Sequence, residues 1–89
     1  MNAVLAVIGK DSVGILSGVS TKCAEFNANI IDVSQTVMSS IFTMVMIVNI
    51  DSLYDELTVF ANAMKEYGKE KNLEIYVMHE DIFNSMHKI

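Results

Sequence analysis

The sequence predicts an α+β fold, in which two helices cover one face of a four-stranded antiparallel sheet. Apolar segments of strand and helix periodicity alternate in the order βαββαβ along the 89 residues. The first and third predicted strands are apolar at both parities, whereas the second and fourth mix apolar with polar residues. Because a strand with two apolar faces belongs inside a sheet, the predicted strand order is 4-1-3-2. This arrangement is the ferredoxin-like sandwich, with both helices on one face.

The first half of the chain supplies a strand, a helix and a second strand. Residues 3–9 form the predicted first strand, and residues 13–26 form a helix with apolar residues three or four positions apart. Asp11 or Ser12 is the expected N-cap, because short polar side chains accept hydrogen bonds from the first helical N–H groups. A turn of small polar residues then leads into the second strand, 29–38.

The third strand and the second helix follow without a break in the apolar pattern. A tight turn of two serines connects to the predicted third strand, 41–51. Ser52 is expected to cap the second helix, with Asp55 completing a capping box three positions later. Gly68 and the charged residues after it mark the expected end of this helix.

The last segments are a fourth strand, 73–79, and a tail, 81–89, that can form a short helix. No proline, linker or low-complexity tract divides the chain. We therefore expect a single domain over residues 1–89, with its core at 3–80 and the tail outside it.

Composition excludes several classes of function. The chain has a net charge of −5, no arginine and six scattered lysines, so neither direct nucleic-acid contact nor a polybasic membrane patch is expected. Its longest apolar stretch, 41–50, is too short and too interrupted to span a bilayer. A single cysteine, Cys23, excludes an internal disulfide, and no segment resembles a secretory signal. We expect a cytoplasmic protein.

The high apolar content indicates a surface that a partner covers. Hydrophobic residues make up 52% of a domain whose small size leaves much of its surface exposed. The second predicted strand carries one charge, Asp32, and no proline, which leaves an undefended sheet edge. We therefore expect a homodimer paired through this strand. The second, outer face of the sheet also needs a cover, either the C-terminal tail or a partner.

The polar loop before the first helix is the main candidate binding site. The segment 9–16, Gly-Lys-Asp-Ser-Val-Gly-Ile-Leu, opens a helix whose first N–H groups have no helical acceptor. With the helix dipole, these groups can hold a carboxylate or another small anion. Glycine costs a helix about 1 kcal/mol relative to alanine, so Gly14 indicates the close approach of a ligand or of a strand. Asp11 is equally consistent with a helix cap alone.

No catalytic or metal site is expected. Cys23 lies on the apolar side of the predicted helix with no cation one turn away, which is typical of a buried hydrophobe. His79 and His87 lack the spacing and the cysteine partners of a metal site. We expect no cofactor.

The same residues resemble the ACT domain, a small amino-acid-sensing module of metabolic enzymes and regulators. The segment 9–16, the run 27–32 (Asn-Ala-Asn-Ile-Ile-Asp) and Gln35 carry the resemblance, within a βαββαβ order that covers 3–80. The chain is similar to small stand-alone ACT proteins of the type that regulates the glycine cleavage system.

The resemblance implies a non-catalytic regulatory homodimer that binds an amino acid between the first loop and the second strand. It assigns ligand contacts to Asp11, Ser12, Val13, Gly14, Ile15 and Asn29. Many amino-acid-binding members have asparagine where this chain has Asp11, whose carboxylate would attract the ammonium group of a ligand and repel its carboxylate. The partner protein that such a module regulates is not evident from the sequence.

Two other functions fit the same fold. One is a dimerisation or scaffold module that docks on a partner protein and binds no ligand. The other, more remote, is an acylphosphatase-like hydrolase, which requires a cationic side chain on the phosphoryl group and in practice an arginine. The chain has no arginine, so a ligand-binding module is the favoured interpretation.

Overall fold

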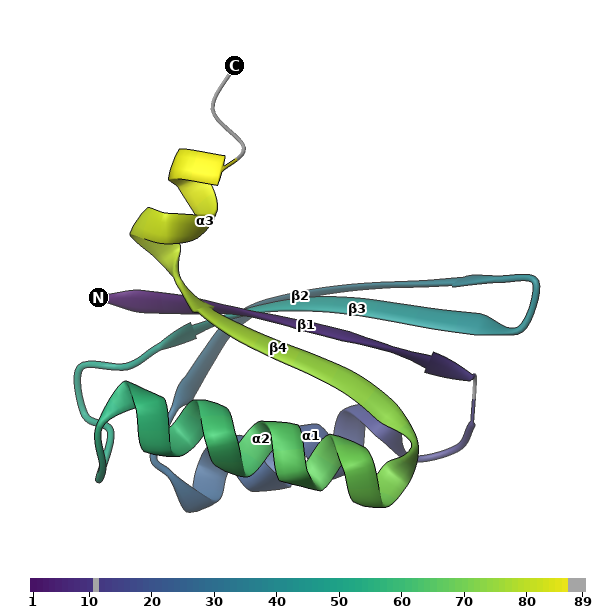
Figure 1. Cartoon of the computed structure of the whole chain (residues 1–89), viewed down its shortest axis with the longest axis horizontal. Coiled ribbons are helices and arrows are strands. Elements are labelled where there is room, and N and C mark those ends of the chain that lie inside the picture. The colour runs from purple at the N-terminus through teal and green to yellow at the C-terminus, as the bar shows by residue number, and fades with distance from the viewer. Residues whose placement is uncertain (11, 87–89) are drawn as a thin grey trace.

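The computed structural model describes residues 1–10 and 12–86. In chain order the elements are β1 (Asn2–Lys10), α1 (Ile15–Glu25), β2 (Asn29–Met38), β3 (Ile41–Asn49), α2 (Leu57–Lys71), β4 (Leu73–His79) and α3 (Glu80–Met86). The strands form one antiparallel sheet in the order β2-β3-β1-β4, with α1 and α2 on the same face (Figure 1). This confirms the predicted ferredoxin-like fold and its strand order.

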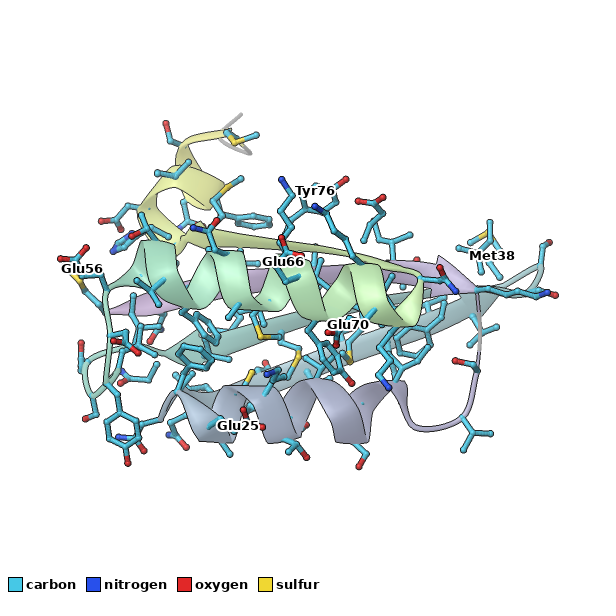
Figure 2. All side chains as sticks on the ribbon, turned by 60° about the horizontal axis from the view of Figure 1, so that its bottom comes forward. Glu25, Met38, Glu56, Glu66, Glu70 and Tyr76 are labelled. Carbon is cyan, nitrogen blue, oxygen red and sulfur yellow. The ribbon has the colours of Figure 1, made fainter. Side chains whose placement is uncertain are left out.

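The core fills the layer between the sheet and these two helices (Figure 2). Alternate residues of β1 and β3 point into it, so Leu5, Val7, Met44 and Met46 are fully buried. The opposite parity of β1 and β3 forms the outer face of the sheet, which explains why both central strands are apolar on both sides. Among the described residues, no helix is long and apolar enough to cross a membrane.

Helix α1 begins later than the sequence predicted. Gly14 is its N-cap, with φ of 86° and ψ of 9°, and no side chain among residues 1–10 and 12–86 is recorded as capping the helix. This left-handed backbone cannot continue a right-handed helix, so the first helical residue is Ile15 rather than Val13. The predicted capping role of Ser12 is therefore wrong, and Asp11 lies outside the described residues.

Helix α2 also begins late, because a tertiary contact holds the segment before it. The N–H of Tyr54 donates to the carbonyl oxygen of Phe26 at 3.1 Å, which ties this segment to the end of α1. The helix starts at Leu57 with Glu56 as an N-cap in extended conformation and without a side-chain cap. The predicted capping box of Ser52 and Asp55 is thus wrong.

Helix α2 ends within the charged residues that follow Gly68, as the sequence predicted. It continues to Lys71 and stops at Asn72, which is left-handed with φ of 59°. Gly68 is buried against β4, where a Cβ atom would lie 2.6 Å from the carbonyl oxygen of Leu73. The glycine therefore permits close helix–strand packing instead of ending the helix.

Candidate functional site

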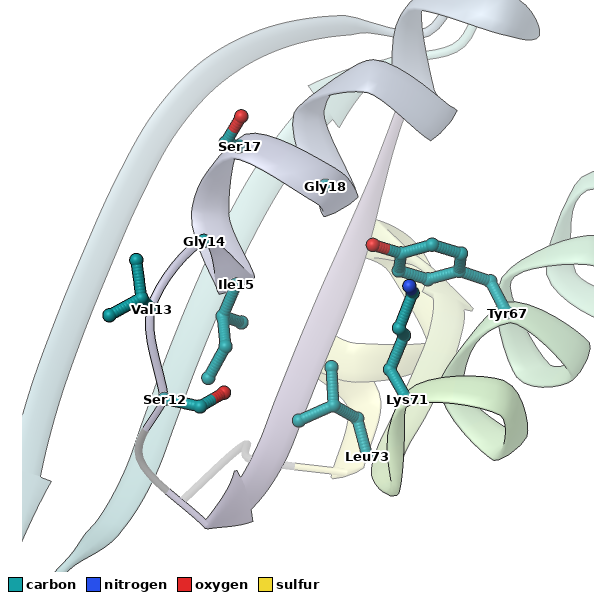
Figure 3. Close-up of a pocket in the computed structure, with 9 residues that line it drawn as sticks. All are labelled: Ser12, Val13, Gly14, Ile15, Ser17, Gly18, Tyr67, Lys71 and Leu73. Carbon is teal, nitrogen blue, oxygen red and sulfur yellow. The ribbon is translucent and has the colours of Figure 1, made fainter.

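A pocket of about 320 Å³ lies between the loop after β1, the start of α1 and the end of α2 (Figure 3). Its volume is near the lower end of the range of small-molecule sites. The residues that line it are Ser12, Val13, Gly14, Ile15, Ser17, Gly18, Tyr67, Lys71 and Leu73.

The α1 side of this pocket offers backbone N–H donors. The first intrahelical bond runs from the N–H of Gly18 to the carbonyl oxygen of Gly14, at 2.9 Å. The N–H groups of residues 15–17 precede this bond and have no helical acceptor, and Gly14 provides no side-chain cap for them. Together with the helix dipole they give this wall a positive partial charge. Ile15, only 7% exposed, adds an apolar side chain to it.

The α2 side brings a hydroxyl and an ammonium group to the same space. The Nζ of Lys71 lies 6.0 Å from the centre of the Tyr67 ring, at the limit of a cation–π contact. Among the described residues, the lysine ion pairs join Lys22 to Glu25 and Lys69 to Glu66, so no carboxylate neutralises Lys71. Figure 3 shows the Tyr67 hydroxyl directed toward α1 at Gly18, with the Lys71 ammonium beside its ring. The pocket therefore favours a ligand with an anionic group.

The glycine that permits a close approach is Gly18, not Gly14 as the sequence analysis inferred. A Cβ atom at position 18 would overlap the hydroxyl of Tyr67, whereas one at position 14 would have no neighbour within 4 Å. Gly14 is needed for its positive φ instead. A second glycine inside the predicted helix was the available signal for this contact.

The expected ligand residues do not all meet in one chain. Ser12, Gly14 and Ile15 line the pocket, and Val13 also borders it, although its side chain is fully exposed and points away from Tyr67 (Figure 3). Asn29 lies elsewhere. It pairs with Asn49, level with the start of β1, whereas the pocket lies beyond the end of that nine-residue strand, roughly 26 Å away.

Sequence reasoning missed Tyr67, Lys71 and Leu73, which come from the end of α2 and the start of β4. In the sequence, Tyr67 continues the apolar spacing of three to four residues in the second predicted helix, and Lys71 is one of the charged residues at its expected end. Both assignments are compatible with their positions. No local signal shows that these residues face a loop more than 50 positions earlier.

The described part of the chain contains no group of three His, Cys, Asp or Glu side chains that could hold a metal ion. Cys23 is buried, and burial raises the pKa of its thiol to about 11. A thiol of this pKa is a poor nucleophile at neutral pH. The Nδ1 of His79 accepts a hydrogen bond from the N–H of Asp81 at 3.0 Å, which gives this histidine a structural role at the start of α3.

Comparison with known proteins agrees with the fold. The profile of the ACT domain family matches residues 2–78. A UPF0237 protein of Listeria innocua is 48% identical over 89 residues, which cover the whole of both chains. An ACT domain protein from Streptococcus pneumoniae has the same fold with a TM-score of 0.82 at 38% identity, over 93% of each chain. A putative glycine cleavage system transcriptional repressor is similar in fold, with a TM-score of 0.70 at 19% identity, over 85% of this chain and 43% of its own.

Proposed function

The chain belongs to the ACT domain family, whose members are generally regulatory and non-catalytic, and we propose that it binds a small amino acid as a homodimer. The pocket at the start of α1 carries this proposal. It combines the N–H groups that precede the first intrahelical bond of α1, the Lys71 ammonium and the hydroxyl groups of Ser12 and Tyr67 in a space of about 320 Å³. That combination suits a ligand of a few heavy atoms with one carboxylate.

In this proposal the ligand carboxylate accepts hydrogen bonds from the N–H groups of residues 15–17 and faces the Lys71 ammonium. The hydroxyl groups of Ser12 and Tyr67 are then available to polar atoms elsewhere on the ligand. Asp11 precedes this wall in sequence and is the proposed partner of the ligand ammonium.

The proposed homodimer joins two chains through β2. Its two-fold symmetry determines which residues of one copy approach the binding loop of the other. β2 is an edge strand, and all its residues from Ser34 to Met38 are exposed. Antiparallel pairing of two copies about Ser34 would put Asn29 of one copy beside Met38 of the other. That end of β2 is level with Lys10, where the binding loop begins. Asn29 would thus approach the loop end of the second copy, from which it is remote in its own chain.

A thermal-shift screen of the protein against the amino acids tests the binding. A ligand at about 100 times its dissociation constant adds roughly 2.7 kcal/mol to the free energy of unfolding, which raises Tm by about 10–20 °C in a domain of this size. We expect Lys71→Met to weaken binding at least about tenfold, because it removes the charge and keeps the apolar stem. Lys65→Met, on the exposed surface of the same helix, is the matched control.

A panel in which no amino acid changes Tm would contradict the proposed sensing function. The protein would then be better described as a scaffold module, which the exposed edge of β2 also favours. Equal affinity in Lys71→Met and the wild type would instead place the ligand outside this pocket. Loss of binding in Lys65→Met as well would show that only the overall charge matters.

A further inference from the structure

Within residues 1–10 and 12–86, the outer face of the sheet, opposite α1 and α2, is covered at one end only. Val4 and Ile8 lie on this face of the same strand, β1. Val4 is 5% exposed, whereas Ile8 is 38% exposed. The difference follows from α3, which contacts β1 and β4 near the start of β1. There the Nδ2 of Asn2 donates a hydrogen bond to Glu80 Oε2 at 3.0 Å.

The other end of this face carries large apolar side chains without a cover. We call it the open end, and its exposed members are Ile8, Met38 and Ile41; the exposed Val45 and Tyr76 lie next to it in the central row of the sheet, which also contains Ser34 and Ala6. They are 38%, 69%, 53%, 38% and 56% exposed, respectively. These residues share one face of the sheet, with Thr43 and Glu74 beside Ile8, and so form a group rather than the singly scattered apolar residues that monomers normally expose.

Helix α3 also carries exposed apolar side chains. It rises from the covered end of the sheet, away from α1 and α2 (Figure 1). Ile82 and Met86 on α3 are 55% and 65% exposed. The covered end therefore presents a projecting apolar helix, and the open end presents a flat apolar surface.

We infer that two copies of the chain stack their outer sheet faces, so that α3 of each copy covers the open end of the other. The required two-fold axis lies between the faces and runs across the strands at the level of Ser34, Val45, Ala6 and Tyr76, which are neighbours across the sheet. A rotation about this axis exchanges the two ends of the face. It brings each projecting helix onto the surface that lacks a cover.

The dimensions fit this arrangement. Packed sheets lie about 10 Å apart, and a helix of seven residues is about 10 Å long, so α3 can bridge the gap between the faces. Four strands about 4.8 Å apart and about 25 Å long give a face of roughly 500 Å² per copy. With the two α3 helices, the contact reaches roughly 1,100 Å² in total, which is enough for a specific interface.

The charges also permit a second copy of the same chain. The outward strand positions carry three charged residues, Lys10, Asp32 and Glu74, so most of the net charge of −5 lies elsewhere. Lys10 stands at the open end, where α3 of the other copy would bring the exposed carboxylate of Asp81. This interface is independent of the proposed amino-acid binding and of pairing through β2.

Sedimentation and light scattering of charge variants test the inference. We expect Ile8→Lys and Ile82→Glu each to halve the mass of the wild-type assembly or to raise its dissociation constant at least about tenfold. The double variant should recover part of the lost association, because the new lysine and the new glutamate carry opposite charges and face each other across the interface. Val59→Lys, at an exposed apolar residue of α2 on the other face, should leave the mass unchanged. Unchanged mass in Ile8→Lys, or a monomeric wild type at submillimolar concentration, would overturn the inference.

Crosslinking provides a second test that does not depend on a disruptive charge. Ala6 lies in the central row, so a short bismaleimide should join two Ala6→Cys chains across the faces, while the buried Cys23 stays unmodified. In a dimer paired only through β2, the two Ala6 positions would be about 24 Å apart and out of reach. No crosslink in Ala6→Cys, or an equal one in the exposed α2 control Thr58→Cys, would refute the stacking of outer faces.

Discussion

Replacement of Gly68 by alanine probes how closely α2 packs against β4. A methyl group at this buried position would lie 2.6 Å from the carbonyl oxygen of Leu73 and 3.1 Å from Cγ1 of Ile75. The first neighbour is backbone and cannot rotate away. Asn72 alone connects the helix to the strand, so α2 cannot move away from β4 without disturbing this left-handed turn.

Two opposing effects determine how much Gly68→Ala changes the free energy of unfolding. Alanine stabilises a helix interior by about 1 kcal/mol relative to glycine. Overpacking of a well-packed core costs about 1–3 kcal/mol, and a backbone neighbour favours the upper end of that range. The expected result is therefore a net loss of about 1–2 kcal/mol, or a decrease in Tm of roughly 5–15 °C.

Thermal and urea unfolding followed by circular dichroism measure this change. Asn62→Ala is the control, because Asn62 is exposed on the same helix and gains helix propensity without a new contact. We expect Tm to rise slightly in the control and to fall in Gly68→Ala. An equal rise in both variants would refute the packing argument, because helix propensity alone would then explain the result.

Three further outcomes follow from the structure. Gly14→Ala should lower the free energy of unfolding by about 1–2 kcal/mol through its φ of 86° alone, measured by urea titration; an unchanged value would refute the left-handed cap. A hydrogen bond from the N-terminal ammonium at 2.6 Å, and a second from Asn49, lower the pKa of Asp51. The ionised Asp51 therefore stabilises the folded protein above pH 3.8, and this stabilisation disappears as pH falls through the lowered pKa. Asp51→Asn should remove this acid dependence from urea titrations, and an identical pH profile would contradict it. Cys23, with its pKa raised to about 11 by burial, should react with a thiol reagent at pH 8 only after unfolding, and rapid reaction in the folded protein would argue against its burial.

The sequence alone was sufficient for the sheet topology. A strand that is apolar at alternate positions has one buried face, and a strand that is apolar at adjacent positions has two. This pattern can be seen within the strand itself, without knowledge of its neighbours. Leu5 and Val4 on adjacent positions of β1 are both buried, one against the helices and one beneath α3. Polar residues mixed into β2, and alternating with apolar ones in β4, marked these two strands as edges in the same way. The strand order therefore followed from patterns of eleven residues or fewer in each strand.

Helix boundaries and the composition of the pocket depended on tertiary structure. The start of α2 is set by a hydrogen bond between Tyr54 and Phe26, and the start of α1 by the backbone angle of Gly14. Neither the hydrogen bond nor the backbone angle can be predicted from the residue preferences of helix caps. The pocket joins Ser12 to Lys71, which are 59 positions apart, because the antiparallel sheet brings the end of β1 beside the start of β4. Local periodicity can identify which side of each helix is apolar, but only the packed sheet decides which loop faces which helix end.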